Sequence, residues 1–382
     1  MAKLGEVCKV SPSTKNIERQ GAWLLNLDMV EQQTGRVIEY KYVGEDDLNG
    51  SIIQFDTENV LYSKLRPNLN KVVLPPKDGF STSELLPLRP DACVLNRDYL
   101  AVFLRSDSFV TWAVSKTAGA KMPRLGTKDL MNAEIPVPTI EQQKKIAEKF
   151  KKLEQLISLR NQQLAKLDEL VKAQFVEMFG DVLLNSMQWP EKTLENMANI
   201  VSGITKGRKT AEADLQEVPY MAVSNVKDGY IDWTTVKTIL ATRQEIEQYR
   251  LMPDDILMTE GGDPDKVGRG AIIKVPLKNS IHQNHIFRVR LDEQEILPSF
   301  FAEYLRHQKA KRYFLGCAKQ TTGIASINMR QLRALPTLVP PLSLQKQFAA
   351  FVERVDQQKQ IVQQSLEKLE LMKKTLMQEY FG

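Results

Sequence analysis

The sequence predicts an α+β protein in which two similar α+β domains are separated by two long helices that form an antiparallel coiled coil. Three observations predict this fold. A segment of 43 residues occurs twice, and each copy contains a long stretch without glycine or internal proline whose apolar residues recur with 4-3 spacing. The sequence in front of each copy mixes short β-branched and aromatic runs with amphipathic helical stretches.

The length and composition bound the class of protein. With 382 residues, of which 42% are hydrophobic and 26% charged, the chain has room for two to three domains with cores of their own. Its three cysteines (Cys8, Cys93, Cys317) are far apart, which argues against a disulfide scaffold or a CxxC zinc site. We find no run of eighteen apolar residues and no signal peptide, and we therefore expect a soluble, cytoplasmic protein. The net charge of +5 permits a polyanionic partner without requiring one.

The duplication defines the domain organisation. Residues 138–150 align with residues 340–352 at a constant offset of 202, and the register continues without a gap until Phe179-Gly180 falls on Phe381-Gly382. Thirteen of the 43 aligned pairs are identical. The segments in front of the copies also correspond, more loosely and with gaps, at 58–67 with 254–264 and at 80–91 with 281–292. We therefore expect domains at 1–137 and 181–339 and helical regions at 138–180 and 340–382.

The two helical copies are suited to each other. Thr139 and Gln142 match a capping box, and the uninterrupted helix of about 38 residues that follows would be roughly 57 Å long. Arg160 interrupts its apolar seam where the second copy has an apolar residue, whereas Lys359 and Lys373 interrupt the second seam opposite apolar residues of the first. Complementary interruptions favour an intramolecular antiparallel pair. The alternative is that each helix pairs with another chain.

Neither α+β domain is basic overall, since lysine and arginine balance the acidic residues in 1–137 and exceed them by two in 181–339. Any polyanion contact must therefore come from loops that combine lysine or arginine with amides, hydroxyls or glycine, which can bind phosphates or base edges. For any single loop the alternative is a solvated hairpin tip, but the loops occur at matching places in both domains. The candidate nucleic-acid-binding residues are Lys64, Arg66, Asn68, Asn70, Lys71, Lys116, Lys121, Arg124, Lys206, Arg208, Lys209, Lys266, Arg269, Lys319, Gln320 and Thr322.

Motifs of catalytic chemistry are missing from the sequence. The prolines at 75–76 and 340–341 do not fit the base-gripping motif of an adenine methyltransferase, and the glycines from 262 to 268 do not make a P-loop. His282 and His285 lie three residues apart on an expected strand and would point to opposite faces, so we expect no metal site. We therefore expect a protein without catalytic residues.

The whole chain resembles one family, the specificity (S) subunits of type I restriction–modification enzymes. The resemblance rests on two variable domains that alternate with two similar helices, and on the sequences IPVPTIEQQKKIAEKF and TLVPPLSLQKQFAAF that open the helical copies. The first copy has Glu141-Gln142-Gln143 where the second has Ser343-Leu344-Gln345, a modest departure from the shared pattern.

The resemblance implies that each variable domain is a target recognition domain that reads one half of a bipartite double-stranded DNA site. It implies that the helices set the gap between the halves and dock methylation (M) subunits, of which the two helix copies suggest two. Restriction (R) subunits would join them, and S-adenosylmethionine, ATP and Mg²⁺ would bind in these partners, not in this chain. The partner-docking candidates on the helices are Gln143, Lys144, Gln345 and Lys346.

Two other interpretations remain open. The chain could be the specificity protein of a related system that only methylates, or a non-enzymatic coiled-coil scaffold with two interaction domains. The scaffold interpretation predicts that the chain shows no salt-dependent binding to duplex DNA.

Overall fold

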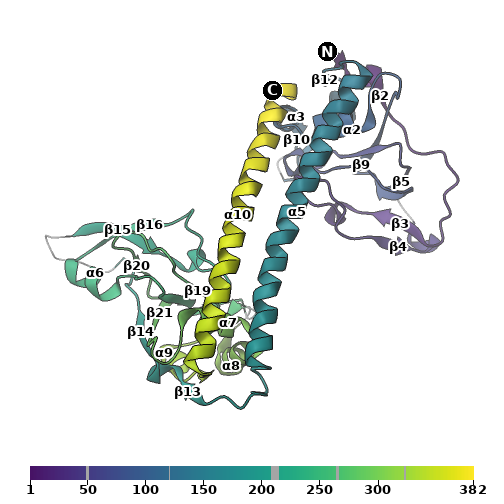
Figure 1. Cartoon of the computed structure of the whole chain (residues 1–382). Helices are drawn as coiled ribbons and strands as arrows, with labels where there is room; N and C mark the ends of the chain where they lie inside the picture. The colour runs from purple at the N-terminus through teal and green to yellow at the C-terminus, as the bar shows by residue number, and fades with distance from the viewer. Residues whose placement is uncertain (49–50, 120, 208–214, 264–265, 322–323) are drawn as a thin grey trace. The chain divides into compact units, whose positions relative to one another are not determined.

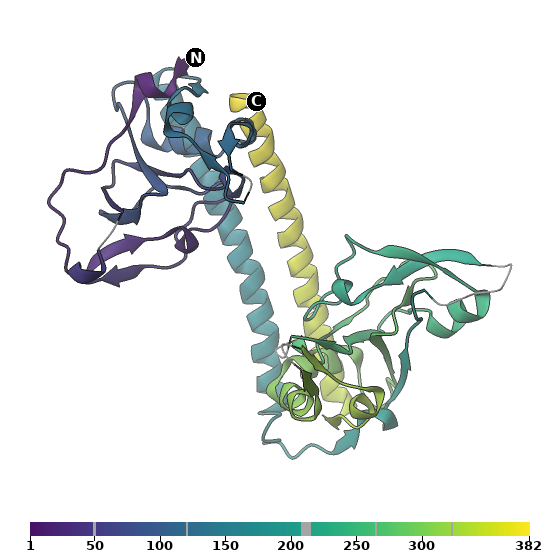
Figure 2. The ribbon, with the colours of Figure 1, turned by 180° about the vertical axis from the view of Figure 1, so that it is seen from behind.

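The computed structural model describes residues 1–48, 51–119, 121–207, 215–263, 266–321 and 324–382. The chain divides into two compact units. Unit 1 comprises Met1–Gln162 and Gln363–Gly382, and unit 2 comprises Gln163–Val362. Each unit therefore contains one α+β domain and a part of each long helix (Figures 1 and 2).

The two long helices are α5 (Ile140–Phe179) and α10 (Leu342–Phe381). Thr139 and Gln142 form the predicted capping box, because Gln142 N donates to Thr139 Oγ1 and Thr139 N donates to Gln142 Oε1. In the described part of the chain, none of the helices has a stretch long and apolar enough to span a bilayer.

The helices pair antiparallel within each unit. In unit 1, Lys149 of α5 contacts Tyr380 of α10, and Glu154 of α5 contacts Lys373 of α10. Residue numbers thus rise along α5 as they fall along α10. In unit 2, Lys359 Nζ lies 2.6 Å from Asp168 Oδ1, so a lysine that interrupts the apolar seam is neutralised by the facing helix. The prediction of an intramolecular antiparallel pair is confirmed (Figure 1).

The α+β domain of unit 1 is built on two four-stranded sheets. One has the order β2-β9-β6-β7, with β2 (Cys8–Val10), β9 (Leu85–Pro90), β6 (Val60–Ser63) and β7 (Val72–Val73). The other has the order β4-β3-β8-β5, with β4 (Lys41–Val43), β3 (Ala22–Leu25), β8 (Gly79–Thr82) and β5 (Ile52–Phe55). Two small ladders pair β1 (Ala2–Lys3) with β12 (Glu134–Ile135) and β10 (Thr117–Ala118) with β11 (Arg124–Leu125).

Four short helices complete this domain: α1 (Leu4–Val7), α2 (Arg97–Leu104), α3 (Asp107–Ser115) and α4 (Thr127–Met131). Ser106 separates α2 from α3, because its backbone is extended and its side chain caps α3. A continuous apolar core joins α2 and α3 to both long helices, through Phe150 of α5 and Phe381 of α10. The long helices are therefore part of the core of this unit.

Unit 2 repeats this plan. Its sheets have the orders β14-β21-β17-β19 and β16-β15-β20, formed by β14 (Ala198–Ser202), β21 (Ile286–Leu291), β17 (Ile256–Thr259), β19 (Gly270–Ile272), β16 (Lys237–Ala241), β15 (Gln216–Met221) and β20 (Ile281–His282). Small ladders pair β13 (Glu191–Thr193) with β24 (Pro336–Leu338) and join β18 (Gly261–Gly262), β23 (Ile324–Ser326) and β22 (Lys319–Thr321). The short helices are α6 (Arg243–Tyr249), α7 (Pro298–Arg306), α8 (Gln308–Cys317) and α9 (Met329–Arg333). In its core, Phe175 and Phe179 of α5 pack against Phe300 of α7, and Phe348 of α10 packs against both phenylalanines of α5.

The two units share details beyond the order of their strands. In each, one strand pair of the second sheet is parallel, β3 with β8 and β15 with β20. In each, a buried tyrosine of the helix after the main sheet donates to the carbonyl of a proline that precedes a long helix, Tyr99 to Pro136 and Tyr304 to Pro336 of β24. The internal duplication that the sequence predicts is therefore a duplication of tertiary structure.

Candidate nucleic-acid interface

The structure brings two of the candidate loops of unit 1 together. Leu65 and Arg124 form a β-bridge, Leu125 N donates to Lys64 O at 2.9 Å, and Arg66 N donates to Pro123 O at 2.8 Å. These bonds join the loop that follows β6 to the β10–β11 hairpin. We call the joined segments, 64–71, 116–119 and 121–125, loop cluster 1.

Loop cluster 1 carries exposed cations. Arg66, Lys116 and Lys121 are exposed and Lys64 is half-buried, and none of the four makes an ion pair among the described residues. Arg124 is exposed but bound to Glu84, with Nε and NH2 3.2 and 3.1 Å from Oε1. Unpaired exposed ammonium and guanidinium groups on adjacent loops are the groups that bind phosphates.

Two candidates of this loop point inward. Asn70 is buried and its Nδ2 donates to Arg105 O at 3.0 Å. Lys71 Nζ donates to Leu27 O at 2.5 Å, and burial lowers the pKa of this lysine against the opposing effect of Asp28. Their hydrogen-bonding groups hold the loop in place, and DNA contact by these two residues stays a prediction. Asn68, between Arg66 and Asn70, is exposed as expected.

Unit 2 has an equivalent cluster. Gly261 pairs with Ser326 and Lys319 pairs with Ser326, so β18, β23 and β22 form the same three-strand arrangement that Leu65, Arg124 and Ala118 form in unit 1. We call residues 260–263, 266–269, 319–321 and 324–326 loop cluster 2.

Of the candidates in unit 2, Lys266 and Lys319 are exposed and Arg269 is half-buried. Lys266 forms an ion pair with Asp263 and lowers the pKa of that carboxyl group. Gln320 lies in β22. The predicted residues Arg208, Lys209 and Thr322 lie outside the described residues. Lys206 is exposed in a separate loop, after the bridge between Ile204 and Gln283, and is not part of loop cluster 2.

Sequence reasoning missed three residues at these clusters, Glu84 in unit 1 and Glu260 and His285 in unit 2. Glu260 Oε2 lies 2.6 Å from His285 Nδ1 at the edge of loop cluster 2. A signal was present in the sequence, because the alignment of the two domains places Glu84 on His285 and Lys64 on Glu260. Glutamate and histidine were not among the residue types, lysine and arginine with amides, hydroxyls or glycine, that define the candidate loops.

The predicted partner-docking residues divide into two kinds. Lys144 and Lys346 are exposed at the starts of the two long helices. Gln143 and Gln345 are fully buried. Their amide groups bond to backbone within their own units, and partner contact by these two side chains stays a prediction.

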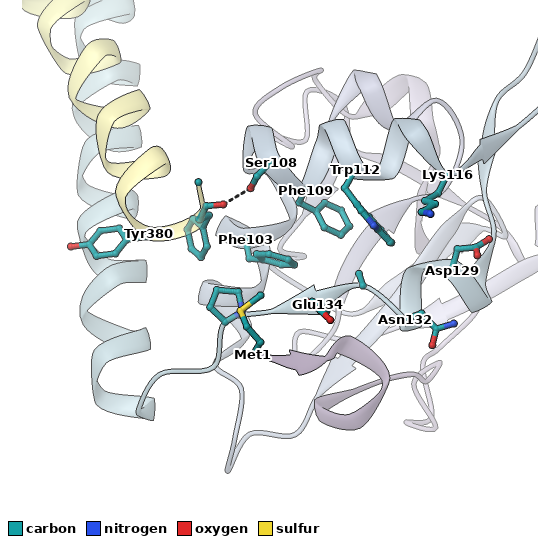
Figure 3. Close-up of a pocket in the computed structure, with 14 residues that line it drawn as sticks. Met1, Phe103, Ser108, Phe109, Trp112, Lys116, Asp129, Asn132, Glu134 and Tyr380 are labelled. Atoms are coloured by element: carbon teal, nitrogen blue, oxygen red, sulfur yellow. Dashed lines mark hydrogen bonds between the residues drawn. The ribbon is translucent and has the colours of Figure 1, made fainter.

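A pocket of about 690 Å³ lies in unit 1 beside α3 and the last turn of α10. Figure 3 shows Phe109, Trp112 and Lys116 along its wall. Ser108 Oγ donates to Phe381 O at 2.5 Å. In the ranges that the structure describes, no group of three or more histidine, cysteine or acidic side chains is placed to hold a metal ion.

Comparisons with known proteins agree with this geometry. The family model described as the type I restriction modification DNA specificity domain matches residues 1–169 and 187–371. The specificity subunit of the type I restriction enzyme EcoKI of Escherichia coli K12 is 24% identical over 284 residues, which are 71% of this chain and 60% of that protein. The type I MjaVIII specificity subunit of Methanocaldococcus jannaschii is 24% identical over 327 residues, 79% of this chain and 73% of that protein. The match to the EcoKI subunit thus spans less than two thirds of its length.

Solved structures show the same fold. The S subunit of the type I restriction–modification system from M. genitalium has a TM-score of 0.58 at 17% identity, covering all of this chain and 95% of that one. A chain from a structure on complex assembly and conformational transition of the type I R-M system has a TM-score of 0.59 at 16% identity, covering all of this chain and 96% of that one. Because the family model matches both α+β domains and most of both helices, the chain belongs to the type I restriction–modification DNA specificity family.

Proposed function

We propose that this chain is the DNA sequence-recognition subunit of a type I restriction–modification complex, in which each α+β domain reads one half of a bipartite site. The observation that carries the proposal is the pair of loop clusters. They have the same backbone register in both units but different side chains. One framework with two sets of side chains suits a protein that reads two different half-sites.

The chain contributes recognition, and its partners contribute chemistry. In the assembly that we propose, methylation subunits bind S-adenosylmethionine and restriction subunits use ATP and Mg²⁺. This chain then has no catalytic role and acts where the host DNA is, in the cytoplasm. Its helices set the gap between the half-sites.

Exposed apolar residues on the long helices support two docking sites for one partner type. Leu159 and Ile361 are exposed and lie 202 residues apart, and so do Leu170 and Met372. By the duplication, Leu159 and Met372 in unit 1 correspond to Ile361 and Leu170 in unit 2. An apolar surface that recurs in both units suits two copies of the same methylation subunit.

Stoichiometry tests the docking proposal. Leu159→Lys and Ile361→Lys, made singly, are each expected to release one of two methylation subunits, and the double variant both, in mass measurements of the co-expressed complex. The matched control is Lys166→Ala, a change at another exposed residue of α5. Complexes of unchanged mass in the double variant would contradict docking at these residues.

Salt-dependent binding tests the DNA interface. In the complex with methylation subunits, Lys116→Ala and Lys121→Ala are each expected to weaken binding to all duplexes alike and to reduce the slope of log K against log salt by about 1. The matched control is Lys41→Ala, a change at an exposed lysine of β4 in the other sheet.

Base-resolution mapping of methylated adenines tests the proposed function as a whole. It should give a bipartite consensus, and methylation without any consensus would refute the proposed function.

A further inference from the structure

The two loop clusters have matching backbone hydrogen bonds at the residue that follows the central strand. Lys64 N donates to Glu84 O at 3.1 Å, and Glu260 N donates to His285 O at 3.0 Å. Lys64 O accepts from Leu125 N at 2.9 Å, and Glu260 O accepts from Ile327 N at 2.8 Å. Lys64 directly follows β6 and Glu260 directly follows β17. Lys64 and Glu260 therefore occupy the same place in the two units, and so do Glu84 and His285.

At the first of these places the side chains have opposite charges, and at the others they differ in chemical type. Unit 1 has the cation Lys64 where unit 2 has the anion Glu260. It has the anion Glu84 where unit 2 has His285, and the ladder places Arg124 where unit 2 has Ser326. The backbone framework is shared, and the charge is reversed at one place, where Lys64 is a cation and Glu260 an anion.

Glu260 is partly exposed and held in position, and Lys64 is half-buried. The side chain of Glu260 is 34% exposed and bonds to His285 through one carboxylate oxygen, Oε2. In unit 1 the Arg124 guanidinium is held by Glu84, whereas Lys64 has no ion pair among the described residues. Lys64 thus offers donors where Glu260 offers an acceptor.

From this charge reversal, and resting on the proposed function, we infer that Lys64 and Glu260 are specificity-determining residues that read bases with opposite hydrogen-bonding patterns. The ammonium group of Lys64 suits the O6 and N7 acceptors of guanine in the major groove. The carboxylate of Glu260 suits an amino donor on a base edge, the N4 group of cytosine. Each unit reads one such base with the residue that directly follows its central strand.

The test uses the complete complex with methylation subunits and base-resolution mapping of methylated sites. Glu260→Gln keeps the size of the side chain but adds a donor. We expect it to lower methylation of the wild-type site by about 10- to 100-fold and to change the preferred base at one position of one half-site only. Lys64→Met is expected to relax the preference at one position of the other half-site, by a similar factor.

Matched controls are Glu293→Gln and Lys128→Met, exposed residues outside the loop clusters, for which the consensus should stay unchanged. Thermal unfolding of each variant complex shows whether the fold is kept. A wild-type consensus that both Glu260→Gln and Lys64→Met preserve would overturn this inference while leaving the proposed function intact. A uniform loss of methylation at all sites, with relative base preferences unchanged, would overturn it too. No consensus in the wild-type complex would instead refute the proposed function.

Discussion

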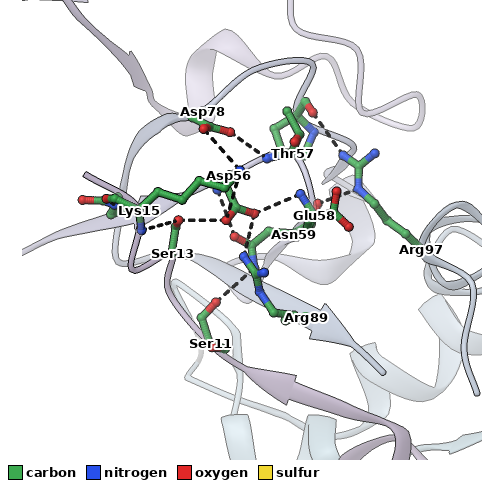
Figure 4. A network of polar contacts seen from close by, with 12 residues as sticks. Ser11, Ser13, Lys15, Asp56, Thr57, Glu58, Asn59, Asp78, Arg89 and Arg97 are labelled. Atoms are coloured by element: carbon green, nitrogen blue, oxygen red, sulfur yellow. Dashed lines mark hydrogen bonds and ion pairs between the residues drawn. The ribbon is translucent and has the colours of Figure 1, made fainter. Parts of the chain in front are cut away.

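In unit 1, NH2 of Arg89 lies 2.6 Å from Oδ1 of Asp56, a carboxylate whose side chain is only 2% exposed (Figure 4). Ser13 Oγ donates to the other oxygen of Asp56 at 2.8 Å. Burial acts to raise the pKa of Asp56, but the hydrogen bonds from Arg89 and Ser13 outweigh it and lower the pKa to about 2. The ion pair joins the loop before β6 to β9, so it fixes the strands that carry loop cluster 1.

Asp56→Asn should therefore destabilise unit 1 in a pH-dependent way. Because the folded pKa lies below the ordinary value near 4, the stabilisation is fully present above about pH 4 and is lost as the pH falls towards 2. We expect Asp56→Asn to lower the free energy of unfolding by about 2 kcal/mol at pH 7, with a difference from wild type that shrinks below pH 4. Denaturant unfolding at several pH values measures this. The control Glu58→Gln, at an exposed neighbour, should change little, and a difference independent of pH would contradict the assignment.

The buried glutamines at the starts of the long helices should be structural. Oε1 of Gln143 accepts from Asn96 N at 2.8 Å, and its Nε2 donates to Val94 O and Pro138 O. Gln143→Leu leaves these three backbone groups without partners and should cost about 2–4 kcal/mol in the free energy of unfolding. Hydrogen exchange should show faster exchange at the amide of Asn96. Lys144→Ala, at the exposed neighbour, should have an effect within about 0.5 kcal/mol.

Replacing the equivalent glutamine of unit 2, Gln345, with leucine tests independently whether these glutamines are structural. Gln345 Oε1 accepts from Leu297 N at 2.8 Å, and Nε2 donates to Glu295 O and Pro340 O. Gln345→Leu should be as destabilising as the change in unit 1 and should speed exchange at the amide of Leu297. Wild-type exchange there would mean that the glutamine does not hold the helix to the domain.

The pairing of the long helices in unit 2 can be measured through Asp168 and Lys359. Their ion pair joins α5 to α10, so the double-mutant cycle Asp168→Asn with Lys359→Met should give a coupling of about 0.5 kcal/mol. The control cycle pairs Lys359→Met with Glu169→Gln, an exposed residue beside Asp168, and should give a coupling near zero. Equal couplings in the two cycles would contradict the observed register of the helices.

Alkylation distinguishes the cysteines. Cys8 is buried, and burial raises its pKa to about 12, so at pH 8 it is a protected thiol. Iodoacetamide should therefore modify the exposed Cys93 in the native protein and leave Cys8 unmodified, as read by mass spectrometry of peptides. Denaturation in urea should make both react. Native modification of Cys8 at the rate of Cys93 would show that β2 does not pack as described.

The sequence was sufficient for features whose signal is local or repeated. The capping box at Thr139 and Gln142, the helix from Ile140 to Phe179 and the antiparallel partner all followed from periodicity and from complementary interruptions. The resemblance to the specificity family also came from such short, contiguous patterns. These signals are readable because a helix satisfies its backbone from residues only four positions away.

The role of individual polar side chains did not follow from the sequence. Gln143 and Gln345 were recognised as a repeated pair, yet the sequence does not show that both amides point into the core. Asp56 binds Arg89 in unit 1, and Asp255 binds Arg290 in unit 2, although the two carboxylates are not at equivalent positions. Met252 N bonds to Asp255 as Asp56 N bonds to Asn59, so Asp255 stands where unit 1 has Asn59.

The sequence by itself therefore determined the duplication, the two long helices and the family of the chain. The tertiary structure alone decided that the loop after β6 meets the hairpin before α4, that Asn70 and Lys71 turn inward, and that Lys64 and Glu260 each bond to a second distant segment. The physical reason is that β-bridges between distant segments position these side chains, and such pairing depends on the packing of the whole sheet and not on the residues beside each loop.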